Sequence, residues 1–545
     1  MVERGDGDWV SRFADEVISE AERRGTGKPI VCASGLSPSG PIHLGNLREI
    51  MTPHLVADEL RRRGVPCDHL LSWDDYDRFR RVPVGIDPSW AEHIGKPLTA
   101  VPAPPGSSHP NWAEHFKAPM IEAMAALGVQ CRMISQTEQY TSGAYRERIL
   151  LAMRERAAID AVLSRHRTKQ AEQPEEPGEP ERAGEYFPYR PYCELCGRDL
   201  TTVTAYDDET TELAYTCECG FGETVRLAEH DQGKLVWKVD WPMRWAYEGV
   251  LFEPSGVDHH SPGSAWTVGG RIVGEVFGGE RPIGPMYAFV GITGMAKMSS
   301  SKGDVPTPSD ALEIMEAPVL RWLYARRKPA QSFKIAFDQE IHRLYDEWDA
   351  LGRKVAAGQG QPAELAAYER AVTTADGPLP ATPHPVPYRT LASIADITTG
   401  HAEQTLRILR DLDGVTGLDA AGPRLDRAQR WVELHLPADQ RTRVREEPDE
   451  GLLDSLGPDE RESLRLLADG LDDWSLDGLT TLVYGVPKLQ AGLPADAPAT
   501  PELKAAQRAF FALLYRLLVG RDTGPRLPTL LLAVGADRVR KLVGA

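Results

Sequence analysis

A segment near the N-terminus has the residues of a phosphate-binding turn. Residues 34–46 read SGLSPSGPIHLGN, between a predicted buried strand at 29–34 and a predicted helix that ends at Gly64. The free N–H groups at a helix N-terminus attract phosphate oxygens, and a histidine there can donate a hydrogen bond to one. A glycine lets a nucleotide approach the backbone closely. We therefore expect the turn to bind a nucleotide through Pro38, Ser39, Gly40, His43, Gly45 and Asn46.

A second segment, about 250 residues later, carries a lysine in a Ser-rich loop. Residues 294–303 read GMAKMSSSKG, and the glycines suit a loop that moves. A lysine in such a loop can stabilise negative charge that builds on a phosphate group. Most Lys- and Ser-rich loops are only solvated, so the order of the two segments along the chain supports the functional interpretation. Together the segments offer His43, Asn46, Lys297, Ser299, Ser300 and Ser301 as candidate catalytic residues at a nucleotide, with Met298 beside Lys297.

Four of the seven cysteines lie close together in the sequence. They form a CxxC pair and a CxC pair: Cys193, Cys196, Cys217 and Cys219. Four thiolates suit tetrahedral Zn²⁺, and Gly197 and Gly220 permit the tight turns that follow each pair. We expect a structural zinc ion here, and core positions for the remaining three cysteines.

The order of predicted elements indicates an α/β fold. A strand at 29–34, a Gly-rich turn, a helix to Gly64 and a strand in CDHLLSWDD form the opening of a doubly wound nucleotide-binding fold. Residues 14–24 predict a further helix, and residues from about 232 to 297 predict strands and turns. After about residue 308 the pattern is almost wholly helical. The substrate is expected at the strand ends beside the nucleotide.

Length, charge and cysteine content restrict the class of protein. A chain of 545 residues predicts two to four domains. The net charge of −18 argues against a protein that coats nucleic acid, although a local basic surface can still bind RNA. We see no apolar run that could span a membrane and no apolar signal region at the charged N-terminus. Few cysteines, odd in number, fit a reduced cytoplasm, so we expect a cytoplasmic location.

The two phosphate-handling segments resemble the signatures of class I aminoacyl-tRNA synthetases. Residues 43–46 resemble the HIGH signature with Asn46 at the fourth position, and residues 297–301 resemble KMSKS with Ser300 in place of the second lysine. The resemblance implies that ATP and Mg²⁺ activate an amino acid, that the loop closes over the pyrophosphate part of ATP, and that the acyl group passes to a ribose hydroxyl of a tRNA. Lys302 offers a substitute for the missing loop charge.

Further stretches are similar to class I lysyl-tRNA synthetases over roughly residues 30–310, among them SWDDYDRFRRVP, KLVWKVDWPMRW and FEPSGVDHH. The resemblance implies lysine contacts at Gly35, Ser37, Trp237, His259 and Tyr287. The residue types agree in part, because a lysine pocket needs a carboxylate for the ammonium group and aromatic walls for the stem. Asp74, Tyr76 and Asp240 supply these beside Trp237.

The resemblance also implies a domain arrangement. A Rossmann-type catalytic domain in two halves, 1–110 and 232–307, would surround an inserted connective domain with a zinc knuckle at 111–231. A helical stem-contact region would occupy 308–375, and an all-helical anticodon-binding domain 376–545. The expected partners are lysine, ATP and tRNA(Lys), and the expected state is a monomer.

Three alternatives stay open. In a glutamyl-tRNA synthetase-like enzyme, Arg244 would meet the side-chain carboxylate of the substrate. Another adenylate-forming enzyme of the same fold would lack tRNA transfer, and the long helical half argues against it. The third alternative is a non-catalytic tRNA-binding relative. The presence of His43 and Lys297 argues against it, because such a protein does not need these catalytic residues.

Overall fold

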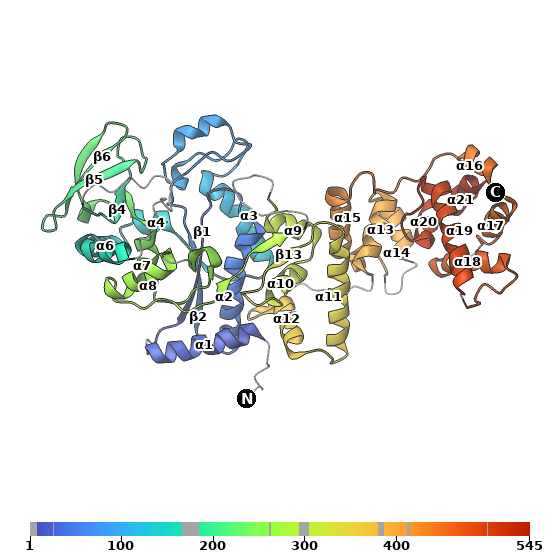
Figure 1. Cartoon of the computed structure of the whole chain (residues 1–545), viewed down its shortest axis with the longest axis horizontal. Coiled ribbons are helices and arrows are strands. Elements are labelled where there is room, and N and C mark those ends of the chain that lie inside the picture. The colour runs from blue at the N-terminus through green and yellow to red at the C-terminus, as the bar shows by residue number, and fades with distance from the viewer. Residues whose placement is uncertain are drawn as a thin grey trace. The chain divides into compact units, whose positions relative to one another are not determined.

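The computed structural model describes residues 8–25, 27–165, 185–260, 263–293, 305–379, 386–410, 415–472, 474–498 and 500–544. The predicted catalytic loop residues Lys297, Met298, Ser299, Ser300 and Ser301 lie outside them. The chain divides into two compact units (Figure 1). The first contains residues 1–312, 317–335 and 354–381, and the second contains residues 313–316, 336–353 and 382–545.

The first unit is built on a parallel four-stranded sheet with the order β3-β2-β1-β9. Its strands are β1 (Ile30–Leu36), β2 (Cys67–Trp73), β3 (Arg132–Ser135) and β9 (Val250–Phe252). Strands β1 and β2 pair in register over their whole length, from Ile30 opposite Cys67 to Leu36 opposite Trp73. The first two strands lie where the sequence predicts them, and the unit has the expected α/β character.

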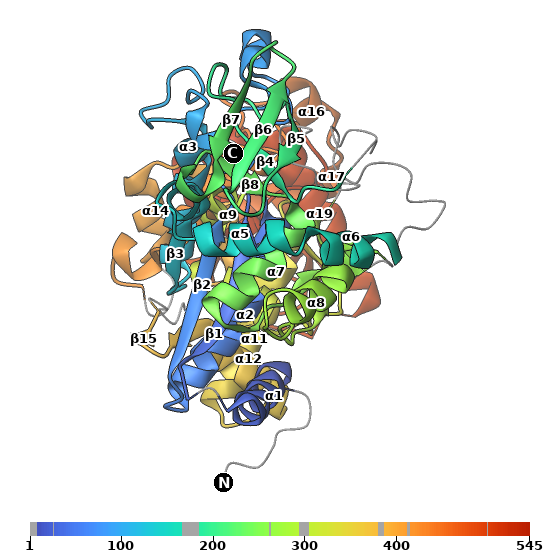
Figure 2. The ribbon, with the colours of Figure 1, turned by 90° about the vertical axis from the view of Figure 1, so that its left-hand side faces the viewer.

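Helices cover both faces of this sheet. Helix α2 (Leu44–Arg62) connects β1 to β2 and packs on one face, and α7 (Trp237–Glu248) lies across the other face (Figure 2). Alternate strand residues face the two helices. Ala33 and Leu70 share a buried cluster with Trp241 and Trp245 of α7, whereas the His69 ring lies 5.9 Å from that of His54 on α2.

The prediction of strands and turns from 232 to 297 is wrong for two stretches, which form α7 and α8 (Ala265–Glu275). Trp237, Trp241 and Trp245 recur every four residues and therefore share one face of a helix, although tryptophan favours strands. The remainder of this region contains the expected short strands. They are β8 (Gly233–Leu235), β9, β10 (Ser255–Gly256), β11 (Met286–Tyr287) and β12 (Val290–Ile292).

The insertion between β3 and α7 begins with three helices and continues as a small β-structure. The helices are α4 (Gln136–Thr141), α5 (Arg146–Arg154) and α6 (Arg156–Arg165). Strand β4 (Tyr189–Pro191) pairs with β8, and an antiparallel sheet follows from β5 (Thr201–Tyr206), β6 (Glu212–Cys217) and β7 (Gly222–Arg226). The four clustered cysteines lie before β5 and at the end of β6, where Cys217 is the last strand residue.

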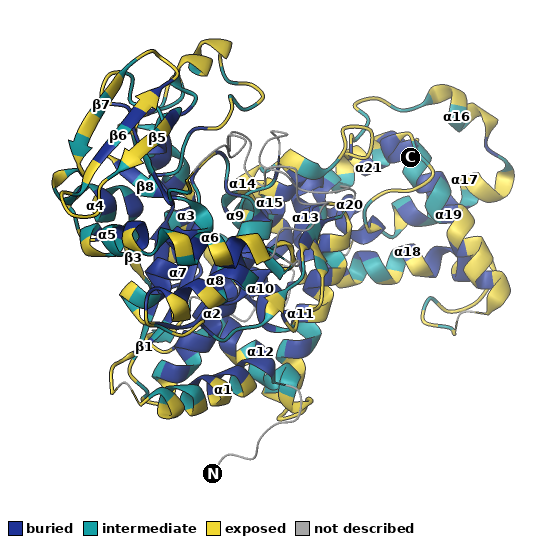
Figure 3. Ribbon diagram, turned by 60° about the vertical axis from the view of Figure 1, so that its left-hand side comes forward, coloured by how far each residue is buried: buried dark blue, intermediate teal, exposed yellow. Residues whose placement is uncertain are grey.

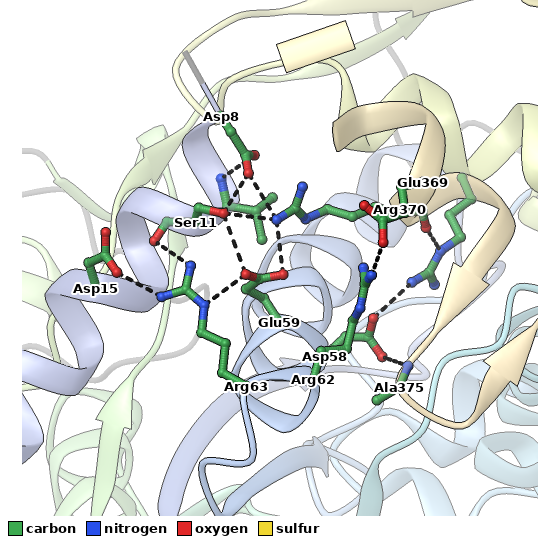
Figure 4. A network of polar contacts seen from close by, with 12 residues as sticks. Asp8, Ser11, Asp15, Asp58, Glu59, Arg62, Arg63, Glu369, Arg370 and Ala375 are labelled. Carbon is green, nitrogen blue, oxygen red and sulfur yellow. Dashed lines mark hydrogen bonds and ion pairs between the residues drawn. The ribbon is translucent and has the colours of Figure 1, made fainter. Parts of the chain in front are cut away.

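Charged side chains fasten other segments of the first unit to α2 (Figure 4). Arg370 lies 2.9 Å from Asp8, which caps α1 (Trp9–Arg24), and 3.0 Å from Glu59 on α2. Glu59 also pairs with Arg63 at 2.8 Å. Arg370 belongs to α12 (Pro362–Val372), so both α1 and α12 hold α2 in place. Further α-helices and strands of the unit are α3 (Trp112–Ala126), α10 (Ala317–Ala325), β13 (Phe333–Ile335), β14 (Thr373–Thr374) and β15 (Gly377–Pro378), together with most of α9 (Pro308–Ile314).

The second unit is helical in its described residues, as the sequence predicts. Its helices are α11 (Glu340–Ala356), α13 (Tyr388–Thr398), α14 (Ala402–Leu409), α15 (Arg424–His435), α16 (Glu450–Ser455), α17 (Pro458–Asp469), α18 (Leu476–Gln490), α19 (Pro501–Val519), α20 (Leu527–Val534) and α21 (Ala536–Val543). Most place buried residues on one face and exposed residues on the other (Figure 3). Buried Arg424 pairs with Glu316 and Asp349. None of the described helices is both long and apolar enough to cross a membrane.

Candidate active site

The N-terminus of α2 is organised by His43 and Asn46. The Nδ1 atom of His43 accepts a hydrogen bond from the backbone N–H of Gly45 at 3.1 Å, and Oδ1 of Asn46 accepts one from the backbone N–H of His43 at 3.3 Å. These two bonds form a capping box, which explains structurally why an amide suits position 46. Because Nδ1 accepts, the ring proton of neutral His43 resides on Nε2. Burial lowers the pKa of His43 and favours this neutral form.

The turn before α2 is held by a hydrogen bond from α3 and by the burial of two of its residues. The carbonyl oxygen of Ser39 accepts a hydrogen bond from the indole of Trp112 at 3.2 Å. Pro38 and Gly40 are buried, whereas Ser39 is exposed. The turn is therefore fixed before any ligand arrives, as a phosphate-binding turn requires.

The described residues on either side of residues 294–304 contact α2. On the N-terminal side, Arg48 in α2 donates a hydrogen bond to the carbonyl of Ala288 at 2.8 Å, two residues before β12. On the C-terminal side, the backbone N–H of Leu44 donates to the carbonyl of Pro306 at 3.1 Å. Ala288 and Pro306 therefore both lie beside the first turns of α2, whose N-terminus His43 caps.

A pocket with about 590 Å³ of empty space lies at the carboxyl ends of the sheet strands and beside α7. Four predicted lysine contacts line it: Gly35, Asp74, Trp237 and His259. Trp237 stacks on Trp241 with ring centroids 5.1 Å apart and an interplanar angle of 16°. The ring of His259 lies 5.5 Å from that of Trp241. These rings give the pocket the aromatic wall that an alkyl stem needs.

The other predicted lysine contacts do not line this pocket directly. Tyr76 is buried among aromatic residues of the insertion, with its ring 5.5 Å from that of Tyr140. Asp240 is fully buried and accepts a hydrogen bond from the Tyr140 hydroxyl at 2.5 Å. Ser37 belongs to the turn before α2, and Tyr287 hydrogen-bonds the side chain of Glu49. Tyr287 thus acts on the pocket through Glu49.

Arg244 is held by two carboxylates at the pocket. Its Nη1 donates to Oδ1 of Asp74 at 2.5 Å, its Nε donates to Oδ1 of Asp240 at 3.1 Å, and its Nη2 pairs with the same carboxylate. Nη1 also donates to Oγ of Ser72 at 3.2 Å. The side chain of Arg244 is only 7% exposed. Its charge is therefore balanced within the protein.

Two further pocket carboxylates, which the sequence did not indicate, have no such cation. Glu49 projects from the second turn of α2, and Glu253 follows β9. Burial raises the pKa of Glu49 to about 8 and that of Glu253 to about 7, and the neighbouring carboxylates add to both shifts. Burial also raises the pKa of Asp74 to about 6, in spite of Arg244. Nothing in the local sequence distinguishes either glutamate from a surface residue.

The four clustered cysteines meet in space. The Sγ atoms of Cys193 and Cys219 lie 3.7 Å apart, as do those of Cys196 and Cys217, and all four lie within 4.8 Å of one another. A tetrahedral zinc site with Zn–S bonds of about 2.3 Å requires sulfur separations of about 3.8 Å. The turns after the pairs need positive φ, which Gly197 (70°) and Gly220 (89°) provide. The donor set and spacing therefore fit Zn²⁺.

Comparison with known proteins identifies the family. A family model described as "tRNA synthetases class I (K)" matches residues 7–377. A lysine--tRNA ligase of Streptomyces coelicolor is 68% identical over 98% of both chains. Those of Thermococcus kodakarensis and Treponema pallidum are 33% and 32% identical, again over 98% of both chains. The family model spans the phosphate-binding turn and the tryptophan-walled pocket, and the relatives match nearly the whole chain. The chain belongs to the class I (K) tRNA synthetases.

Proposed function

We propose that this chain is a lysine--tRNA ligase, which activates lysine with ATP and transfers it to tRNA(Lys). The observation that carries the assignment is the charge of the pocket. Glu49 and Glu253 face a tryptophan-walled cavity without a protein cation, next to a helix start suited to phosphate. A buried carboxylate without a partner is costly, so such a pocket favours a ligand that brings positive charge on an apolar stem.

The same geometry argues against a glutamate substrate. A glutamyl enzyme needs a free cation for the side-chain carboxylate, and Arg244 was the candidate. Arg244 is already paired with Asp74 and Asp240. A substrate carboxylate would have to displace these carboxylates while it approached Glu49 and Glu253. Lysine meets no such repulsion.

For activation, we assign phosphate contacts to the start of α2. The lysine carboxylate attacks the α-phosphorus of ATP, the bond to the bridging oxygen breaks, and pyrophosphate leaves. His43 can donate its Nε2–H to a phosphate oxygen, because Nδ1 is occupied by the Gly45 N–H. Lys297, which follows the α2-contacting residue Ala288 along the chain, is our candidate for the charge on the departing pyrophosphate. Mg²⁺ would accompany ATP, as it does with nucleotide substrates generally.

We also assign roles to the parts outside the catalytic sheet. The four cysteines hold a structural zinc ion, and the insertion around them guides the tRNA acceptor end. We propose the helices of residues 308–375 as the stem-contact region and those of residues 376–545 as the anticodon-binding domain. This division differs slightly from the compact units, because residues 336–353 belong to the second unit.

The test is ATP–pyrophosphate exchange with each amino acid in turn, with and without tRNA. We expect exchange with lysine only, followed by lysylation of tRNA(Lys). Exchange with glutamate and none with lysine would overturn the assignment. Lys297→Ala should slow adenylate formation much more than it weakens lysine binding. A variant with an unchanged rate would remove Lys297 from the mechanism, whereas Lys302→Ala tests whether the second lysine contributes.

A further inference from the structure

Tyr140 joins the insertion to the start of α7 through both functions of its hydroxyl group. The residue lies in α4, the first helix of the insertion, and is 2% exposed. Its hydroxyl donates a hydrogen bond to Oδ1 of Asp240 at 2.5 Å and accepts one from the backbone N–H of Leu235 at 3.3 Å. Leu235 is the last residue of β8, and Asp240 lies in the first turn of α7. One hydroxyl therefore fastens the chain on both sides of the point where α7 begins.

The first turn of α7 has few fastenings of its own. The first N–H groups of a helix have no partner within it, and a polar side chain at the N-cap usually binds one of them. In α7 the N-cap is Val236, which makes no such bond. Pro242 has no backbone N–H, so the second turn donates one hydrogen bond fewer to the first. A contact from outside the helix is therefore more important here than at an ordinary helix start.

The ring of Tyr140 is held so that its hydroxyl has one direction. It stacks on the ring of Tyr76 with centroids 5.5 Å apart, and the ring of Tyr145 meets it edge-on at 5.1 Å. The hydroxyl of Tyr192 donates to the carbonyl of Tyr76 at 2.6 Å and so fixes the stacking partner. Trp237 is the first residue of α7 and lines the pocket. Any shift of the helix start therefore moves a wall of the pocket.

We propose that Tyr140 is a positioning residue for lysine binding, which holds the start of α7 so that Trp237 stands in place before the substrate arrives. The proposal rests on the lysine specificity inferred above. Tyr140 is not among the residues that line the described pocket, so its effect passes through α7. A wall that is already in place spares lysine the cost of ordering it on binding.

The test removes the hydroxyl and keeps the ring. Lysine and ATP are titrated separately by calorimetry into the full-length wild type and Tyr140→Phe. The dissociation constant of lysine should rise about threefold to tenfold, as for a lost hydrogen bond, and that of ATP should not change. Tyr189→Phe is the matched control, because its hydroxyl is buried in the same aromatic cluster and has no hydrogen-bond partner within the described residues. An unchanged lysine affinity in Tyr140→Phe, or an equal loss in both variants, would overturn the proposal.

A double-mutant cycle separates positioning of Trp237 from a general loss of structure. Trp237→Ala removes the wall that Tyr140 is proposed to hold. In that background, Tyr140→Phe should weaken lysine by less than about twofold, because the two residues act on the same step. If Tyr140→Phe weakens lysine by the same factor with and without Trp237, its role is not the one proposed.

Hydrogen exchange followed by mass spectrometry supplies a readout at the helix start itself. In the wild type without lysine, the amide of Leu235 should be protected, and Tyr140→Phe should increase exchange there while β2 stays protected. Should Tyr140→Phe fail to fold, the wild type decides: a Leu235 amide that is protected only after lysine is added overturns the proposal. Wild-type enzyme that neither binds nor activates lysine refutes the proposed function itself, whereas an active wild type with an unaffected Tyr140→Phe refutes only the positioning role.

Discussion

Lysine binding should strengthen as pH rises from 6.5 to 8.0, because Glu49 must lose its proton to hold an ammonium group. Burial, together with the negative charges of Glu253, Asp74 and Asp258, raises the pKa of Glu49 to about 8, and the hydrogen bond from Tyr287 opposes this shift. A group with a raised pKa in the free protein stays protonated below that pKa. An ammonium ligand lowers the pKa again and expels the proton.

The magnitude follows from the protonated fraction. For a pKa of about 8, the apparent dissociation constant is increased about 33-fold at pH 6.5 and about twofold at pH 8.0, so affinity should rise about 16-fold between them. Deprotonation of Glu253, whose pKa is about 7, should increase the lysine affinity about fourfold more over the same pH interval. The Glu49→Gln variant should bind lysine more weakly and retain only the smaller dependence.

The assay is isothermal titration calorimetry of lysine alone, since ATP has its own titration in this range. Titrations in two buffers with different ionisation enthalpies should show proton release at pH 6.5 that declines toward pH 8. A control titration with ATP should show no dependence on the Glu49→Gln substitution. A lysine affinity that is constant over this range, or tightest at pH 6.5, would refute the reasoning.

Three other expectations concern the residues around the pocket, the helix start and the cysteines. Arg244→Met leaves Asp74 and Asp240 without their cation, so urea unfolding should show a free energy of unfolding lower by about 3–5 kcal/mol. The double variant with Asp74→Asn should recover part of this loss. An Arg244→Met variant as stable as the wild type would contradict the pairing. His43→Ala should lower the free energy of unfolding by about 1 kcal/mol through the lost helix cap, and it should also slow adenylate formation. His43→Asn can still cap the helix, so it should keep the stability and slow adenylate formation. Equal adenylation rates in both variants and the wild type would contradict the phosphate contact. Metal analysis of the purified wild-type protein should find one zinc ion per chain, and that of Cys196→Ser should find none. Purified wild-type protein without zinc would contradict the site.

Much of the fold could be predicted from periodicity and turn residues. The Gly-rich turn between an apolar stretch and an amphipathic one predicted β1 and α2, and helical spacing predicted the second unit. The exception was instructive. The segment around Trp237 has residues that favour strands, but their spacing of four places them on one face of a helix that packs on a sheet. Local propensity is weak compared with the burial of such a face.

The sequence by itself determined the phosphate-binding turn, the cysteine ligand set and the acidic, tryptophan-rich character of the substrate site, because these depend on residues that are close together along the chain. Only the tertiary structure decided how the charges pair. Glu49 from α2 and Glu253 from the end of β9 are 204 positions apart in the numbering yet line one pocket, while Arg244, which also lines it, is paired with Asp74 and Asp240. Which carboxylates remain for lysine is a property of long-range packing, since burial and neighbouring charge are set by elements distant in sequence.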